Sequence, residues 1–231
     1  MPDKLILEIA VETPEAAEAA ERAGASRIEL CADLRSSGLT PSVELMRKTR
    51  TAVKLPIHVM IRPRPGEFSH GKAEVAAMHA SIELARVNRM DGIVLGVLTS
   101  NRKVDVKTTQ KLIEAAHPLP VTFHRAFDLC ADKTAALEDC IRAGAKRILT
   151  SGGAVTAVRG SSALRAMIEA GKGRIIIMPG GGINRDNLRA IRRSTGATEF
   201  HSGLGTVLDY GSPDIPGFQR RVRELVACLD K

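Results

Sequence analysis

Charged and polar side chains stand at or just beyond the ends of several short apolar runs in this chain. They are carboxylates, imidazoles and guanidinium groups, which transfer protons or hold anions in proteins. The candidate site residues are Glu8, Glu29, Arg62, His124, Arg125, Asp128 and His201. If the apolar runs are parallel strands, these side chains converge at one edge of the sheet. We therefore expect a single polar site built from several strand ends.

The arginines and the histidine of this set suggest two kinds of chemistry. Arg62 or Arg125 could hold a carboxylate or a phosphate through two parallel hydrogen bonds. His124 could act as an acid–base group or as a metal ligand, with Asp128 orienting its ring. The absence of a lysine at any expected strand end argues against Schiff-base chemistry.

A structural interpretation competes with the catalytic one. Glu8 and Glu29 lie within apolar strand patterns, so each must find a partner if it points into the protein interior. An ion network in which both glutamates pair with Arg62 would satisfy them without any catalysis. The spacing of the residues does not separate the two interpretations.

Glycines follow the last two expected strands and suggest an anion site. Glycine lets backbone N–H groups approach an anion closely, and the N-terminus of a following helix adds partial positive charge. The expected anion-binding residues are Gly180, Gly181, Gly182, Ser202 and Gly203. A simpler interpretation is that these glycines only permit tight turns.

Cys31 directly follows an expected strand and is the cysteine best placed for chemistry. Its thiolate could bind a soft metal or act as a nucleophile, although a single cysteine is often just a small buried apolar residue. Cys130 is the only other cysteine expected near the same face, and Cys140 and Cys228 fall in helical patterns. Without a paired-ligand motif, spacing alone gives little indication of a metal.

Short apolar runs alternate with amphipathic stretches along the whole chain, which is typical of repeated βα units. We expect strands at residues 5–11, 27–30, 57–61, 92–95, 121–123, 147–150, 175–178 and 199–201. We expect helices near residues 14–23, 42–53, 73–88, 106–116, 132–142, 160–170, 186–194 and 214–229. This order predicts one α/β domain over residues 1–231, a (βα)8 TIM barrel with its site at the carboxyl ends of the strands.

An internal repeat supports the number of units. The segment Ala23–Ile28 is echoed 120 residues later by Ala143–Ile148, and more weakly by Thr195–Phe200. In each copy a glycine should end a helix with positive φ just before a strand begins. A displacement of 120 residues corresponds to four units of about 30 residues, which suits a barrel of eight.

The charge of the chain is uneven. Residues 142–231 carry 15 Lys and Arg against 7 Asp and Glu, which accounts for the net charge of +8. No aromatic residues interleave with these arginines, so we expect solvated helix faces and no nucleic-acid partner. No stretch is long and apolar enough to span a membrane, and the N-terminus shows no signal region. We expect a cytoplasmic protein whose partner is a small molecule or a metal, with a homo-oligomer left open.

Several ordered segments resemble the CutC family of copper homeostasis proteins. They include RIELCA at 27–32, HVMIRPR at 58–64, VTFHRAFD at 121–128 and IMPGGG at 177–182, and the resemblance covers nearly the whole chain. The loops at 36–38 and 65–67 depart from the family pattern. The resemblance implies a βα barrel, a cytoplasmic location and Cu(I) binding through Cys31, which matches a cysteine to which copper binding is attributed in the family.

Two functions follow as hypotheses. The first is a copper homeostasis protein that binds Cu(I) through Cys31, and it rests on the family resemblance. The second is a lyase-like or isomerase-like barrel enzyme acting on a small phosphorylated or carboxylated metabolite. It rests on the polar residues and glycine turns at the strand ends.

Overall fold

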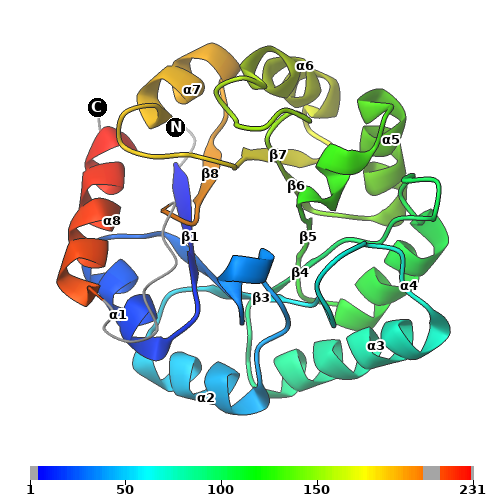
Figure 1. Cartoon of the computed structure of the whole chain (residues 1–231), viewed down its shortest axis with the longest axis horizontal. Coiled ribbons are helices and arrows are strands. Elements are labelled where there is room, and N and C mark those ends of the chain that lie inside the picture. The colour runs from blue at the N-terminus through cyan, green and yellow to red at the C-terminus, as the bar shows by residue number, and fades with distance from the viewer. Residues whose placement is uncertain (1–4, 205–213, 230–231) are drawn as a thin grey trace.

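Strands and helices alternate through the part of the chain that this computed structural model describes, residues 5–204 and 214–229 (Figure 1). The eight strands in these residues are β1 (Ile6–Val11), β2 (Arg27–Leu30), β3 (Ile57–Met60), β4 (Gly92–Leu95), β5 (Val121–Phe123), β6 (Arg147–Thr150), β7 (Ile176–Pro179) and β8 (Glu199–Ser202). Each lies within one residue of the expected boundaries at both ends. The expected order of strands is confirmed.

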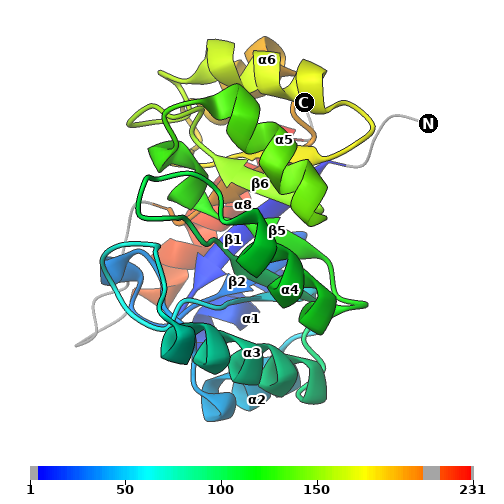
Figure 2. The same cartoon turned by 90° about the vertical axis from the view of Figure 1, so that its right-hand side faces the viewer.

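The helices form an outer ring around the strands (Figures 1 and 2). Those in the described residues are α1 (Pro14–Arg22), α2 (Val43–Ala52), α3 (Lys72–Val87), α4 (Val106–Ala116), α5 (Lys133–Ala143), α6 (Ser161–Gly171), α7 (Leu188–Thr195) and α8 (Ile215–Leu229). Side chains that accept a hydrogen bond from a backbone N–H fix several helix starts. They are Thr13, Ser42, Asp105 and Asp132.

The strands form one parallel sheet that curves into a barrel. Hydrogen-bonded neighbours follow the order β7-β6-β5-β4-β3-β2-β1-β8, and β7 and β8 at the two ends lie side by side (Figure 1). The register aligns Glu8 of β1 with Arg27 of β2 and with His201 of β8. Alternate residues of each strand point into the barrel, so this register places the three side chains in adjacent interior layers.

The repeated segments behave as expected. Gly24, Gly144 and Gly196 each follow a helix with φ of +92°, +90° and +74°, which glycine adopts without strain. The residue three positions after each glycine begins β2, β6 or β8. The repeat therefore marks three equivalent helix-to-strand junctions of the barrel.

Two short 3-10 helices at the mouth were not expected from the sequence. One is η1 (Leu34–Ser36) after β2, and the other is η2 (Arg125–Leu129) after β5. Each is too short to show a helical period. Both follow strand ends, and η2 carries the expected site residues Arg125 and Asp128 into positions that a simple βα turn would not give.

Candidate active site at the mouth of the barrel

A network of buried charges forms the floor of the site. Arg27, Arg147 and Glu199 begin β2, β6 and β8 and point into the barrel. Glu199 accepts hydrogen bonds from Nη2 of Arg27 at 2.7 Å and from Nε of Arg147 at 3.1 Å. Arg27 also pairs with Glu8. Two guanidinium groups thus face two carboxylates, which compensates the cost of burying them.

Glu8 connects this network to His201. Oε2 of Glu8 pairs with Arg27, and Oε1 lies 2.8 Å from Nδ1 of His201. Burial alone would raise the pKa of Glu8, but Arg27 and His201 outweigh it and hold that pKa well below its ordinary range. The ionised carboxylate therefore keeps a proton on Nδ1 of His201 and leaves Nε2 for other contacts.

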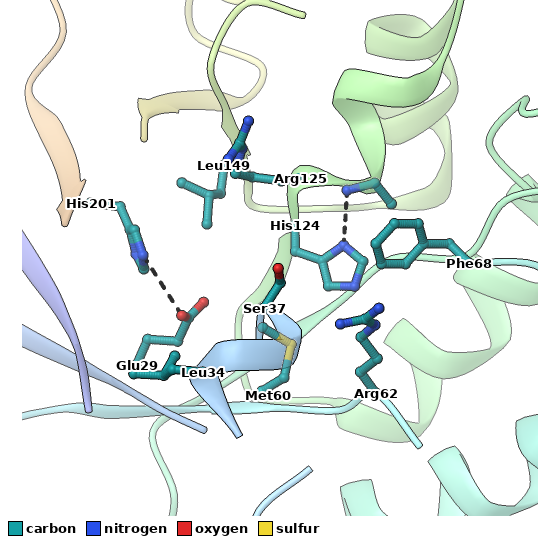
Figure 3. Close-up of a pocket in the computed structure, with 11 residues that line it drawn as sticks. Glu29, Leu34, Ser37, Met60, Arg62, Phe68, His124, Arg125, Leu149 and His201 are labelled. Atoms are coloured by element: carbon teal, nitrogen blue, oxygen red, sulfur yellow. Dashed lines mark hydrogen bonds and ion pairs between the residues drawn. The ribbon is translucent and has the colours of Figure 1, made fainter. Parts of the chain in front are cut away.

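Glu29 lies on the other side of the His201 ring, with Oε2 at 3.8 Å from Nε2 (Figure 3). Burial raises the pKa of Glu29. Burial alone would lower the pKa of His201, but Glu29 and Glu8 outweigh it and raise that pKa. A single proton shared between Glu29 and His201 suits both shifts. Oε1 of Glu29 is buried and bonds to none of the described residues.

Glu8, Glu29 and His201 also bring three ligand atoms within 4.8 Å of one another, which is close enough for a metal ion. Both oxygens of Glu8 are, however, already engaged by Arg27 and His201. A cation placed there would compete with a buried guanidinium group. We therefore interpret the three residues as an ion network.

A cavity of about 240 Å³ opens beside Glu29 and His201. Its other walls come from the ends of β3, β5 and β6 and from the loops that follow β2 and β3 (Figure 3). The lining residues are Glu29, Leu34, Ser37, Met60, Arg62, Phe68, His124, Arg125, Ala126, Leu149 and His201. Of the predicted site residues, Glu29, Arg62, His124, Arg125 and His201 thus meet at one cavity, and Glu8 lies behind it.

His124 stands across the cavity from His201 and is held in the neutral state (Figure 3). Its Nδ1 accepts a hydrogen bond of 3.2 Å from the backbone N–H of Ala126, so the neutral ring carries its proton on Nε2. Burial lowers the pKa of His124 to about 3, and the charge of Arg62 adds to the effect. His124 is therefore a hydrogen-bond donor, not a cation.

Packing fixes the position of this imidazole. The ring of Phe68 lies 4.9 Å from it, centroid to centroid. A Cβ atom at Gly96 would stand 2.4 Å from the ring of His124, so only glycine leaves room for it there. The ring is thus held between the β3–α3 loop and the end of β4.

The structure gives Asp128 other partners than the predicted His124. Asp128 pairs with Nε of Arg125 at 2.9 Å and accepts hydrogen bonds from Ser151 and from the backbone N–H of Gly153. Nη2 of Arg125 donates to Oγ of Ser151 at 3.1 Å. Because η2 turns the chain after His124, the aspartate side chain reaches the loop after β6. Asp128 therefore positions Arg125.

Arg62 does not pair with Glu8 or Glu29, so the expected network does not form. Its guanidinium group donates to backbone oxygens, with Nη1 at 2.7 Å from Ser36 and Nη2 at 3.0 Å from Gly66. It also lies 4.7 Å over the ring of Phe68. Arg62 therefore joins the loops after β2 and β3. Arg27, and not Arg62, is the arginine that pairs with Glu8.

Arg27, Arg147 and Glu199 were missed as interior residues because each follows a turn and precedes the apolar part of its strand. The internal repeat contained the pattern that could have identified them. The residue three positions after the glycine is charged in all three copies, and a charged residue at one repeated barrel position indicates an interior network.

The glycine turns only partly match the expected anion site. Gly181 and Gly182 have φ of +94° and +78°, and their N–H groups make no backbone hydrogen bond within the described residues. The N–H of Gly180, by contrast, donates to the carbonyl of Thr150, and Oγ of Ser202 donates to that of Ile183.

The helix expected near residues 186–194, after the glycines, begins at Leu188. Between Gly182 and α7 lies a turn in which the side-chain amide of Asn187 donates to the carbonyl of Gly182. Gly203 is exposed, and residues 205–213, which follow β8, lie outside the described residues.

Cys31 is fully buried beside the cavity. Its Sγ donates to Oε2 of Glu29 at 3.5 Å, and burial together with the charge of Glu29 raises the pKa of the thiol well above its ordinary value. Cys31 packs with Met60 in a small cluster that also contains Val94. The other cysteines lie elsewhere, and Cys130 lines a separate cavity beside α5.

Three arginines of the basic C-terminal third contact α8. Arg189 and Arg192 of α7 donate to the backbone carbonyls of Ala227 and Leu229 at the end of α8. Arg185 pairs with Glu224 at 3.4 Å. Within the described residues, no helix is long and apolar enough to cross a membrane.

The fold and the cavity define a (βα)8 barrel with a cavity, lined by charged and apolar side chains, at the carboxyl ends of its strands. A profile of the CutC family matches residues 5–206. The chain therefore belongs to the CutC family.

Curated relatives share the sequence over most of its length. The "Copper homeostasis protein cutC homolog" of Homo sapiens is 44% identical over 206 residues, which cover 89% of this chain and 76% of the human protein. The "family protein CutC" of Xanthomonas axonopodis pv. citri (strain 306) is 41% identical over 219 residues, covering 95% and 90% of the two chains.

Solved structures agree on the barrel. The putative copper homeostasis protein CutC of Streptococcus agalactiae superposes with a TM-score of 0.83 and 31% identity, over 87% of this chain and 100% of that chain. Thiamine phosphate pyrophosphorylase of Pyrococcus furiosus superposes with a TM-score of 0.62 and 18% identity, over 98% and 96% of the two chains. This second likeness concerns the fold alone.

Proposed function

We propose that the chain is an enzyme that binds one small carboxylated or phosphorylated metabolite in the cavity at the mouth. Glu29 lines this cavity, and its buried Oε1, which has no partner among the described residues, carries the proposal. A buried polar atom without a hydrogen bond costs free energy. A hydroxyl group of a bound metabolite would supply the missing donor.

The opposite wall of the cavity supports an anionic end on the ligand. Arg125 is partly exposed, and its Nη1 bonds to none of the described residues, while Asp128 and Ser151 fix the rest of the guanidinium group. Gly181 packs against that group. The cavity volume lies below the usual range for drug-sized ligands, which favours a small metabolite.

Thermal-shift and calorimetric titrations with pyruvate, dihydroxyacetone phosphate and inorganic phosphate test this proposal. At least one organic probe should raise the melting temperature, because a ligand that binds only the folded state stabilises it. Arg125→Met should weaken that binding at least tenfold. Arg159→Met, which removes an exposed arginine from the loop after β6, is the matched control and should not. No stabilisation by any probe, or equal affinity in both variants, would contradict the proposal.

Cu(I) binding through Cys31 is the second candidate, and the packing of two sulfur side chains favours it. Sγ of Cys31 and Cε of Met60 lie 3.1 and 3.3 Å from the same point, the Cβ position that Gly38 leaves empty. A thiolate and a thioether are the soft ligands that Cu(I) prefers. Cys31 and Met60 thus carry donors of the kind that suits this metal, and binding would displace the thiol proton.

Competition with a chromophoric Cu(I) chelator tests this second candidate. Cys31→Ser should lower the affinity for Cu(I), and Met60→Leu should lower it less. Cys140→Ser, at a buried cysteine in α5, is the control and should behave as wild type. Equal affinity in wild type and Cys31→Ser would exclude the Cys31 site.

We propose a cytoplasmic location because of the redox state of the cysteines. All four are free, as is usual in a reducing compartment. Fractionation of cells that express the tagged chain would test this, with recovery in the secreted or membrane fraction as the contrary result.

A further inference from the structure

Two imidazole rings face the same cavity with opposite hydrogen-bonding roles (Figure 3). His201 donates through Nδ1 to Glu8 at 2.8 Å, so its Nε2 holds a lone pair when the proton shared with Glu29 is on the carboxyl group. His124 accepts through Nδ1 from the N–H of Ala126 at 3.2 Å, so its Nε2 carries the proton. One ring is thus set up as an acceptor and the other as a donor.

We propose that His201 and His124 form a proton-transfer pair for a small carbonyl compound with a hydrogen on the adjacent carbon. His201 is the general base, and His124 donates a hydrogen bond to the carbonyl oxygen. The substrate class is an α-hydroxycarbonyl compound or an α-keto acid with a carboxylate or phosphate group. This inference rests on the proposed function and adds the reaction and the role of each ring.

The proton transfer needs no oxidant or further reactant. The C–H bond next to the carbonyl breaks, and its proton moves to Nε2 of His201. The electron pair of that bond forms a carbon–carbon double bond, while the carbonyl π pair moves to the oxygen and gives an enolate. Nε2–H of His124 stabilises this oxygen. In an α-hydroxycarbonyl compound, the hydroxyl proton moves to the enolate oxygen and the carbon proton returns from His201 to the former carbonyl carbon, which completes an isomerisation. Return of a proton to the same carbon exchanges the hydrogen with solvent.

The surroundings of the two rings prevent them from exchanging roles. His201 lies between two carboxylates, Glu8 and Glu29, which stabilise its protonated form. His124 lies beside Arg62 and Phe68, and no carboxylate of the described residues pairs with it. Environments that shift the pKa values of two titratable groups in opposite directions allow one group to act as a base and the other as a neutral hydrogen-bond donor.

Glu29 lies beside His201 and lines the same cavity as both rings (Figure 3). Oε2 faces His201, and the unpartnered Oε1 is free to accept a hydrogen bond from a substrate hydroxyl. An α-hydroxyl group lies next to the carbonyl that His124 would contact.

Hydrogen exchange in D₂O, followed by proton NMR, tests the pair. The probes are dihydroxyacetone phosphate and pyruvate, and wild type should accelerate exchange at the carbon next to the carbonyl. His201→Asn and His124→Asn each retain a polar group near the former Nδ1 position and remove Nε2. Each variant should lose about 100-fold to 10,000-fold of the acceleration. His79→Gln, on the outer helix α3, should not change it.

The outcomes separate this pair from the proposed function. Circular dichroism first establishes that both asparagine variants are folded, and their affinity for the probe should change far less than the exchange rate. A wild-type protein that binds a probe without exchanging its hydrogen would overturn the pair and leave the binding site in place. Full exchange activity in either folded asparagine variant would overturn the assigned roles. The absence of both binding and exchange would contradict the proposed function itself.

Discussion

Nδ1 of His201 lies 2.8 Å from Oε1 of Glu8, a residue 193 positions earlier in the sequence. β1 and β8 are neighbours, and their register aligns the two residues. Closing the barrel thus brings a carboxylate from the first strand against an imidazole from the last one. The same carboxylate pairs with Arg27, so site geometry and barrel stability depend on one buried side chain.

Removing the charge of Glu8 should destabilise the fold. Glu8→Gln leaves Arg27 with Glu199 as its only carboxylate partner in the described residues, and Glu199 also serves Arg147. Breaking a buried ion pair costs about 3–5 kcal/mol. Urea denaturation should show a loss of this size. The matched change Glu15→Gln at an exposed position of α1 should stay within about 0.5 kcal/mol. Equal free energies of unfolding in wild type and Glu8→Gln would show that the network is not needed for folding.

The free energy of unfolding should fall on acidification before most carboxylates titrate. Burial lowers the pKa of both His58 and His124 from 6.5 to about 3. Between these values the unfolded chain binds more protons than the folded one, so stability decreases as pH falls below about 6.5. Glu8, with its depressed pKa, adds a further loss below its ordinary value of 4.5. The raised pKa of His201 acts in the opposite direction, because it adds stability at low pH that is lost as pH rises.

Denaturation curves measured in steps from pH 7 to pH 4 check this pH dependence. His124→Asn removes one of the two groups and should flatten the slope between pH 6.5 and 4.5. An unchanged slope in that variant would mean that His124 is not held neutral in the folded protein.

A methyl group at Gly96 should displace the imidazole of His124. The added Cβ would stand 2.4 Å from the ring, so the ring or the end of β4 must move. Gly96→Ala should cost about 1–3 kcal/mol of stability. The variant should still fold, but it should no longer bind the ligand. The control is Gly71→Ala, where the nearest atom lies 3.9 Å away. Undisturbed binding in Gly96→Ala would argue against a role for His124 in the cavity.

Arg62 should matter for the loops at the mouth more than for the barrel. Arg62→Lys keeps the charge but cannot reach Ser36, Gly38 and Gly66 at once. Amide hydrogen exchange should accelerate at residues 36–38 and 64–68 and remain unchanged in β1 and β2. Arg86→Lys on the surface of α3 is the control. Uniform acceleration in the whole chain would instead mean that Arg62 contributes to the global stability of the barrel.

The barrel could be predicted from the sequence because its units are regular. Alternating strand and helix patterns and the glycines at 24, 144 and 196 give the order and number of units. The two 3-10 helices could not be predicted, because a single turn leaves no period to detect. They decide where Asp128 and Ser37 end up, so the local geometry of the mouth was only partly predictable.

The partners of the charged residues were harder to predict than their positions. The chemistry of a guanidinium group predicts that Arg62 needs acceptors, but backbone carbonyls of two loops satisfy it as well as carboxylates do. The partners of Glu8 depend on strand register, which a single sequence does not specify. The interior position of Arg27 can be predicted from the repeat only when the repeat is placed on the barrel.

A crystal structure of the protein soaked with dihydroxyacetone phosphate tests the site at the mouth most directly. We predict that the ligand occupies the cavity with its carbonyl oxygen at hydrogen-bond distance from Nε2 of His124. Its hydroxyl group should lie against Oε1 of Glu29, and its phosphate should lie against Arg125. Ligand density outside the cavity, or water alone between Glu29 and His124 at saturating ligand, would contradict the site.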